Sequence, residues 1–132
     1  IYTEVDILSL HDALPISHST SPQSRLFLTG FQDINWEKIN SEAKIIIYRS
    51  LQELMSNMKK HSKASIIGLN FKMTGSKIHI TYSDNGVGFS PEDFKKGSGL
   101  QNVENRIVSI AGEFNFHSAK EKGFSANILI PV

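Results

Sequence analysis

Hydrophobic and polar positions alternate with two different periods along this chain, and each change of period marks a change of secondary structure. Five segments have the alternation of apolar and polar residues, or the β-branched and aromatic content, that is typical of strands. They are Arg25–Thr29, Ser65–Met73, Lys77–Ser83, Glu113–His117 and Phe124–Ile130. Two other segments, Asn40–His61 and Leu100–Ala111, carry apolar residues at the spacing of an amphipathic helix. The core-facing stripe of the first helix is expected to contain Ile47, Leu51, Leu54, Met55 and Met58, and one face of the third strand is expected to contain Ile78, Ile80 and Tyr82. The order of these elements predicts an α+β fold, a two-layer α/β sandwich in which a mixed sheet packs against one layer of helices.

Turn residues predict where several of these elements end. Gly75-Ser76 separates two strand segments by the two-residue connection that is typical of a hairpin. Gly112 is expected to end the second helix. Pro131 is expected to end the pairing of the last strand, because proline has no N–H to donate to a neighbouring strand.

The first part of the chain reads differently from the rest. Pro15 and the polar cluster at 17–22 interrupt it before the first predicted strand. We therefore expect a linker-like or non-native segment at residues 1–23, followed by a single folded domain at residues 24–132.

Composition narrows the range of functions. The 132 residues include 14 Lys+Arg and 13 Asp+Glu, and the resulting net charge of +1 produces no field that attracts nucleic acid or a membrane surface. The absence of cysteine excludes disulfides, thiol catalysis and cysteine-rich zinc sites, and it is compatible with a reducing compartment. The longest apolar runs are far shorter than the roughly 20 residues that cross a bilayer. We therefore expect a cytoplasmic domain with no nucleic-acid partner and no direct contact with a membrane.

One stripe of the first predicted helix carries polar residues of an unusual combination. At about 100° per residue, the stripe contains Glu53, Asn57, Lys60 and His61. Many surface helices have a solvated polar face, but a carboxylate, an amide oxygen and a cation together suit a metal-bound polyphosphate. Glu53 can accept a proton, Asn57 can offer an oxygen to Mg²⁺, and Lys60 can neutralise phosphate charge. His61 is equally well explained as an imidazole favoured by the C-terminal end of the helix dipole.

Glycines concentrate between the third predicted strand and the second predicted helix. Asp84-Asn85-Gly86-Val87-Gly88 follows the strand, and Gly97-Ser98-Gly99-Leu100 opens the helix. Each motif alone is ordinary turn chemistry. Their position is informative, because backbone N–H groups at a helix N-terminus can hold anionic oxygens.

Taken in order, the helical and glycine motifs resemble the nucleotide-binding boxes of the GHKL ATPase superfamily, which has the Bergerat fold. The motifs are Glu53-x-x-x-Asn57-x-x-Lys60-His61, Asp84-x-Gly86-x-Gly88 and Gly97-x-Gly99-Leu100. The segments 48–57 and 99–106 look most like the ATP-binding catalytic domain of bacterial two-component sensor histidine kinases with a short lid, here residues 90–96. The resemblance covers residues 25–132.

This resemblance implies ATP and Mg²⁺ as cofactors and assigns roles to particular residues. Glu53 is implied as the catalytic base and Asn57 as the Mg²⁺ ligand. Asp84 is implied to accept a hydrogen bond from the exocyclic amine of adenine, a donor that guanine lacks at that position. The other implied ATP-binding residues are Lys60, His61, Gly86, Gly88, Gly97, Ser98, Gly99 and Leu100.

The resemblance also implies a reaction and its partners. The γ-phosphoryl group of Mg-ATP would pass to a histidine on the dimerisation domain of the parent kinase, and from there to a response regulator. His11-Asp12 is similar to the acceptor pair of the family, but Pro15 disrupts the helix that the acceptor requires, so we expect the acceptor outside this chain. The third glycine box of the family is incomplete, because Lys122 precedes a single Gly123.

Two alternatives remain open at this point. An anti-sigma-factor-type serine kinase has similar boxes and a similar length. A nucleotide-gated binding module would use the same pocket without phosphotransfer.

Overall fold

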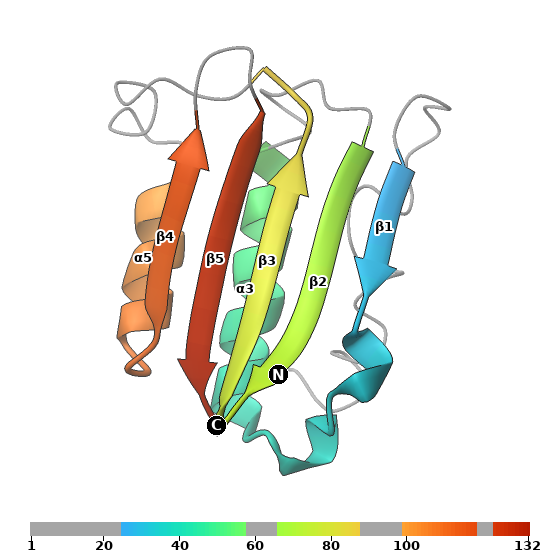
Figure 1. Cartoon of the computed structure of the whole chain (residues 1–132). Helices are drawn as coiled ribbons and strands as arrows, with labels where there is room; N and C mark the ends of the chain where they lie inside the picture. Colours follow the sequence, from blue (N-terminus) through green and yellow to red (C-terminus); the bar gives the residue numbers. More distant parts are fainter. Residues whose placement is uncertain (1–24, 58–65, 88–98, 119–122) are drawn as a thin grey trace.

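The apolar side chains of the chain meet between one face of a five-stranded sheet and the two α-helices that cover it (Figure 1). This architecture is that of a computed structural model, which describes residues 25–57, 66–87, 99–118 and 123–132. Within these residues, both α-helices lie on the same face of the sheet. The predicted α+β sandwich, a mixed sheet with one layer of helices, is confirmed.

The strands lie within one residue of their predicted bounds. They are β1 Arg25–Thr29, β2 Ile66–Thr74, β3 Lys77–Asp84, β4 Glu113–Ser118 and β5 Phe124–Pro131. The spatial order is β1-β2-β3-β5-β4, with β1 parallel to β2 and all other neighbours antiparallel. Gly75-Ser76 connects β2 to β3 as predicted, and Gly75 has the positive φ of 63° that such a tight turn favours. Because β5 lies between β3 and β4, the end of β3 pairs with the start of β5.

The helix layer consists of α3, Ser41–Asn57, and α5, Leu100–Val108. Asn40 begins α3 as an N-cap, since its Oδ1 accepts a hydrogen bond of 2.8 Å from the backbone N–H of Ala43. Residues 58–61 of the predicted first helix lie outside the described residues. Among the described residues, no helix has the length and apolar character needed to span a membrane.

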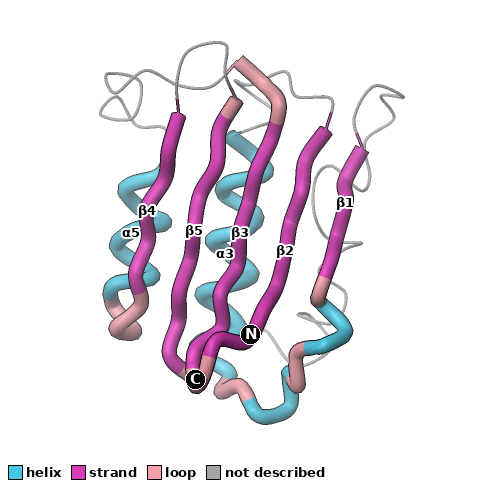
Figure 2. Tube along the Cα trace, viewed as in Figure 1, coloured by secondary structure: helices cyan, strands magenta, loops and turns pink. Residues whose placement is uncertain are grey.

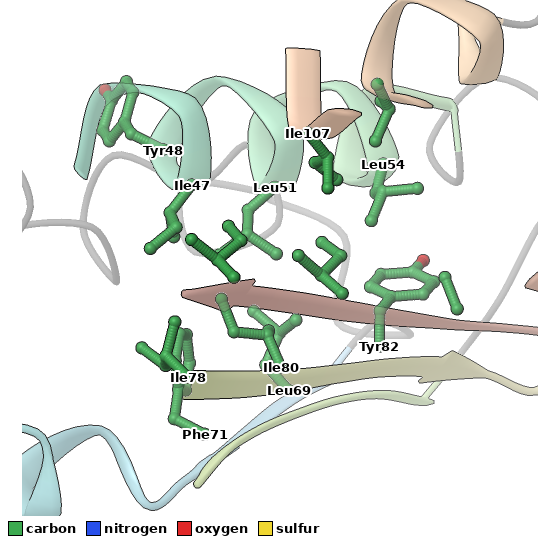
Figure 3. Close-up of a cluster of buried hydrophobic side chains, with 14 of the residues drawn as sticks. Ile47, Tyr48, Leu51, Leu54, Leu69, Phe71, Ile78, Ile80, Tyr82 and Ile107 are labelled. Carbon is green, nitrogen blue, oxygen red and sulfur yellow. The ribbon is translucent and has the colours of Figure 1, made fainter. Parts of the chain in front are cut away.

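The core is built from the predicted apolar stripes. Figure 3 shows Ile47, Leu51 and Leu54 of α3 pointing toward β2, β3 and β5. The predicted inward face of β3, formed by Ile78, Ile80 and Tyr82, is buried against them. The remaining buried apolar side chains on α3, α5, β2 and β5 are Ala43, Tyr48, Met55, Leu100, Val103, Ile107, Ile67, Leu69, Phe71, Phe124, Ala126, Ile128 and Ile130. Met58, predicted for the same stripe, lies outside the described residues.

Two short 3₁₀ turns, η2 (Phe31–Asp33) and η3 (Trp36–Lys38), were absent from the prediction. They connect β1 to α3, as Figure 2 shows. Three residues are too few to produce a periodic pattern, so the sequence does not predict these turns. Aromatic packing stabilises them. The ring of Phe31 lies 5.0 Å from that of Trp36 and 5.4 Å from that of Phe71, between ring centroids.

The last strand and its register end at Pro131, as predicted, but the missing N–H of the proline is not what ends them. Pro131 lies opposite Lys77, and the backbone N–H of Val132 donates a hydrogen bond of 2.9 Å to the carbonyl of Ser76. Successive residues of an antiparallel strand bond to opposite neighbours, so the nitrogen of Pro131 faces away from β3. On that side β4 has already ended, because its register begins with Glu113 opposite Leu129. The missing N–H therefore costs no ladder hydrogen bond.

The end of α5 also differs from the prediction in its mechanism. Ala111, with φ of 61°, is the left-handed residue, whereas Gly112 was expected to end the helix. The N–H groups of Ala111 and Gly112 donate to the carbonyls of Val108 and Ile107, at 3.0 and 2.9 Å. This pair of bonds is a Schellman cap. Gly112 is required for space, because an ideal Cβ there would lie 2.7 Å from Cγ2 of Ile107.

Replacing Ala111 by glycine should stabilise the domain. An alanine in the left-handed region carries a steric cost that glycine avoids, so we expect the free energy of unfolding to rise by about 0.5–1 kcal/mol. Urea unfolding followed by circular dichroism measures the change. The same substitution at Ala43, inside α3, should instead lower the free energy of unfolding by about 1 kcal/mol. A loss of stability in both variants would contradict the strained cap.

Candidate functional site

The three motifs singled out in the sequence converge at one edge of the sandwich. α3 ends there, β3 ends there and α5 begins there, at the top of Figure 1. Glu53 and Asn57 lie in the last turns of α3, Asp84 is the last residue of β3, and Gly99 precedes α5. Segments more than forty residues apart in the sequence therefore contribute to a single edge.

Glu53 lies against the N-terminus of α5. An ideal Cβ at Gly99 would lie 2.7 Å from Cδ of Glu53 and even closer to Oε1, so only glycine fits at this position. Gly99 also has a φ of 87°, in the left-handed region, and no described side chain caps the helix after it. The half-buried Glu53 carboxylate thus faces the positive end of the α5 dipole.

Asn57 is buried, unlike the solvated side chains on the polar face of an ordinary surface helix. It is the last residue of α3, its side chain is 7% exposed, and its Nδ2 has no hydrogen-bond partner among the described residues. Leaving a buried polar atom without a partner costs about 1–3 kcal/mol. An amide N–H left unpaired in this way fits a site in which a bound ligand accepts its hydrogen bond. The oxygen of the same amide is a suitable ligand for Mg²⁺. Within the described residues, no three His, Cys, Asp or Glu side chains form an alternative metal site.

Asp84 is held by hydrogen bonds from its own strand and the loop that follows. The hydroxyl of Tyr82 donates to Oδ2 at 2.8 Å, and the backbone N–H of Gly86 donates to Oδ1 at 2.9 Å. A backbone hydrogen bond from Phe124, on β5, also acts on this carboxyl. Burial raises the pKa of Asp84 above its ordinary value, and these hydrogen bonds counteract only part of the increase.

The backbone around Asp84 is fixed from two sides. Asn85 exchanges hydrogen bonds with the start of β2, since the N–H of Ile66 donates to its Oδ1 at 3.0 Å and its own N–H donates to the carbonyl of Ile66 at 3.2 Å. Gly123 packs on the other side, with a φ of 81° and an ideal Cβ that would collide with the carbonyl oxygen of Asp84. The single glycine of the incomplete third box is therefore the one that this contact requires.

The remaining predicted residues divide into two groups. Gly86 is buried beside Asp84, and Leu100 is a fully buried first residue of α5. Lys60, His61, Gly88, Gly97 and Ser98, together with the predicted lid at residues 90–96, lie outside the described residues. Tyr82 was predicted only as a core residue of β3. Its contact with Asp84 was missed, although a tyrosine at a buried position signals a hydroxyl that needs a partner.

Comparison with known proteins identifies the family of the chain. The model of the family "Histidine kinase-, DNA gyrase B-, and HSP90-like ATPase" matches residues 42–132. Sensor histidine kinase ComP of Bacillus subtilis is 30% identical over 95 residues, or 70% of this chain, and sensor histidine kinase YdfH of the same organism is 35% identical over 89 residues, or 64% of this chain. The chain spans only 12% and 22% of the lengths of these two relatives.

A solved structure shares the fold. The histidine kinase domain of the Erythrobacter litoralis EL346 blue-light activated histidine kinase superposes with a TM-score of 0.68 and 16% sequence identity, covering 95% of this chain and 57% of that one. The family match covers both helices, every strand except β1, and the edge at which Glu53, Asn57, Asp84 and Gly99 gather. The chain belongs to the histidine kinase-, DNA gyrase B- and HSP90-like ATPase family, as a catalytic ATPase domain of the sensor histidine kinase type.

Proposed function

We propose that this domain binds Mg-ATP at the edge formed by the ends of α3 and β3 and the start of α5. We further propose that it transfers the γ-phosphoryl group to a histidine on the dimerisation domain of its parent sensor kinase. The observation that carries the proposal is the Asp84 carboxylate, oriented by Tyr82 and Gly86 on the same edge as Glu53 and the α5 N-terminus. A half-buried acceptor and a positive helix end on one edge suit a ligand with a hydrogen-bond donor at one end and phosphates at the other.

Asp84 would recognise the base. Its carboxylate would accept a hydrogen bond from the exocyclic amine of adenine, whereas the oxo group that guanine carries there would face a second acceptor. An acceptor that is buried without a donor costs about 1–3 kcal/mol of binding free energy, which is enough to make the site prefer ATP to GTP. Gly86, buried next to this carboxylate, leaves room for the base to approach the backbone.

Asn57 and the α5 N-terminus would hold the phosphates and the metal ion. The Asn57 side-chain oxygen is suited to ligate Mg²⁺, which when bound neutralises phosphate charge and aligns the γ-phosphoryl group for transfer. Gly99 lets the first turn of α5 approach the phosphates closely. Lys60, His61, Gly88, Gly97 and Ser98 complete the proposed nucleotide contacts.

Glu53 would act as the base. It lies beside the α5 N-terminus, where the phosphates would be held, and so close to the reacting groups. There it would accept the proton that the acceptor imidazole loses as its nitrogen attacks phosphorus. A response regulator would then receive the phosphoryl group, and the supply of ATP places this reaction in the cytoplasm. Curated relatives named as sensor histidine kinases favour this reaction over the serine kinase and the binding module.

The proposal is tested by the nucleotide preference of the Asp84→Asn variant. Titration calorimetry with Mg²⁺ should show that the wild type binds ATP and does not bind GTP comparably. The ATP affinity of the variant should be at least tenfold lower, because its amide presents a donor or a single acceptor in place of the carboxylate. Asp33→Asn, the same change at an exposed carboxylate of η2, should bind ATP like the wild type. Failure of the folded wild type to bind millimolar ATP would refute the proposal.

Substitution of Glu53 by glutamine should separate binding from transfer. ATP affinity should stay within about threefold of the wild type, while phosphorylation of the parent kinase should fall about 10²–10⁴-fold, since the amide cannot accept a proton. Incorporation of labelled phosphate measures the transfer step. Glu37→Gln, at an exposed position of η3, is the matched control and should retain full transfer. An equal loss of binding and transfer in Glu53→Gln would contradict the role as base.

The raised pKa of Asp84 predicts that the site lowers stability as pH rises. The folded state binds the proton of the Asp84 carboxyl more tightly than the unfolded state does. The stability that the protonated carboxyl contributes is therefore fully present below about pH 4, and it is lost as the pH rises through the raised pKa of Asp84. Without nucleotide, Asp84→Asn should therefore gain stability relative to the wild type between about pH 4 and pH 7. Urea unfolding at several pH values measures the difference. A constant difference for Asp84→Asn would overturn this explanation.

A further inference from the structure

We propose that Tyr82 is a positioning residue for base recognition. Its hydroxyl orients the Asp84 carboxylate and, together with two backbone N–H groups, leaves that carboxylate one acceptor position for adenine. This inference rests on the proposed function and deepens it, because it names a residue that sets the nucleotide preference of the same site.

The Tyr82 hydroxyl is held in a fixed place. Tyr82 and Asp84 are two residues apart on β3, so both side chains project from the same face of the sheet. The tyrosine is 1% exposed, and its ring packs edge-on against Phe124, which stacks on Phe116, with centroid separations of 5.8 and 5.7 Å. Figure 3 shows this ring on β3, among the apolar side chains between the sheet and the helices. A ring packed this way cannot swing, so its hydroxyl stays 2.8 Å from Oδ2 of Asp84.

The acceptor positions of Asp84 are nearly all occupied. An ionised carboxylate has about four positions at which it can accept a hydrogen bond. The Tyr82 hydroxyl, the Gly86 N–H and the Phe124 backbone use three of them. Counting the described residues alone, one position remains, and it matches the single donor that adenine presents to this carboxyl. Removal of the Tyr82 hydroxyl would free a second position and release the carboxyl from its fixed orientation.

The bond between the two side chains has a fixed direction. Burial, and then the charge of Asp84, raise the pKa of Tyr82 far above its usual range, so the hydroxyl keeps its proton and always donates. The same bond lowers the pKa of Asp84, against the larger effect of burial. Tyr82 therefore favours the ionised carboxylate, which is the form that accepts a hydrogen bond most strongly from an amine.

A mutant cycle tests this role. In Tyr82→Phe, ATP affinity should fall about tenfold by calorimetry, because the ring remains and the orienting hydroxyl is lost. Purine riboside triphosphate, which lacks the exocyclic amine, should bind the variant and the wild type within about threefold of each other. In the Asp84→Asn background, Tyr82→Phe should change ATP affinity by less than about threefold, because a residue that acts through Asp84 has no further effect once the carboxylate is gone.

Tyr48→Phe is the matched control. Tyr48 is also buried, but its hydroxyl accepts from Nε2 of Gln52 at 3.2 Å on α3, so its removal should leave both nucleotide affinities unchanged. Circular dichroism establishes that each variant is folded, and a Tyr82→Phe variant that does not fold is remade with the stabilising Ala111→Gly substitution.

Four outcomes decide between the claims. If Tyr82→Phe weakens the binding of ATP and of purine riboside triphosphate equally, Tyr82 is a structural residue and the inference is overturned. An unchanged affinity for ATP would also overturn it. Absence of ATP binding by the folded wild type would instead refute the proposed function, and this inference with it. Weakening that is confined to ATP and disappears in Asp84→Asn supports the positioning role.

Discussion

The packing of α3 across the middle of the sheet is the constraint on which both the fold and the site depend. Ile47, Leu51 and Leu54 lie on β2, β3 and β5, and this contact fixes the rotation of the helix about its axis as well as its position along the strands. Once the rotation is fixed, Glu53 must face the start of α5, and Asn57 must lie at the edge where β3 ends. The apolar stripe that stabilises the domain therefore also places its candidate catalytic residues.

The candidate site is a region of local energetic cost supported by that core. Asn57 buries an unpaired amide nitrogen, Asp84 is held in surroundings that disfavour its charge, and Gly99 and Gly123 adopt left-handed conformations where the backbone meets Glu53 and Asp84. The unpaired amide nitrogen and the disfavoured charge are unfavourable in the free domain, and each would become favourable if a nucleotide supplied a partner. The two glycines carry no such cost, and they let the backbone approach these side chains closely.

Much of this arrangement could be predicted from local patterns. Strand bounds followed from alternation, the core faces of α3 and β3 from their periods, the candidates Glu53 and Asn57 from their spacing and chemistry, and Asp84 from the resemblance of its motif to a known family. Features that a distant segment decides could not be predicted from local patterns. The burial of Asn57, the strand register that accommodates Pro131 and the close approach of Leu129 to Gly112 depend on neighbours that are remote in sequence. Residues 31–38 form short turns that aromatic contacts stabilise, and no periodic pattern in the sequence predicts such contacts.

The sequence by itself determined the class of fold, the order of the elements and the family to which the domain belongs, because periodicity and motif spacing are properties of consecutive residues. Only the tertiary structure decided which of those residues touch. It brought the Tyr82 hydroxyl to Asp84, placed Gly99 against Glu53, and left a hydrogen-bonding position of Asn57 unfilled. The physical reason is that hydrogen-bond satisfaction and steric fit depend on atoms from several elements at once. Those atoms meet only when the helices close on the sheet.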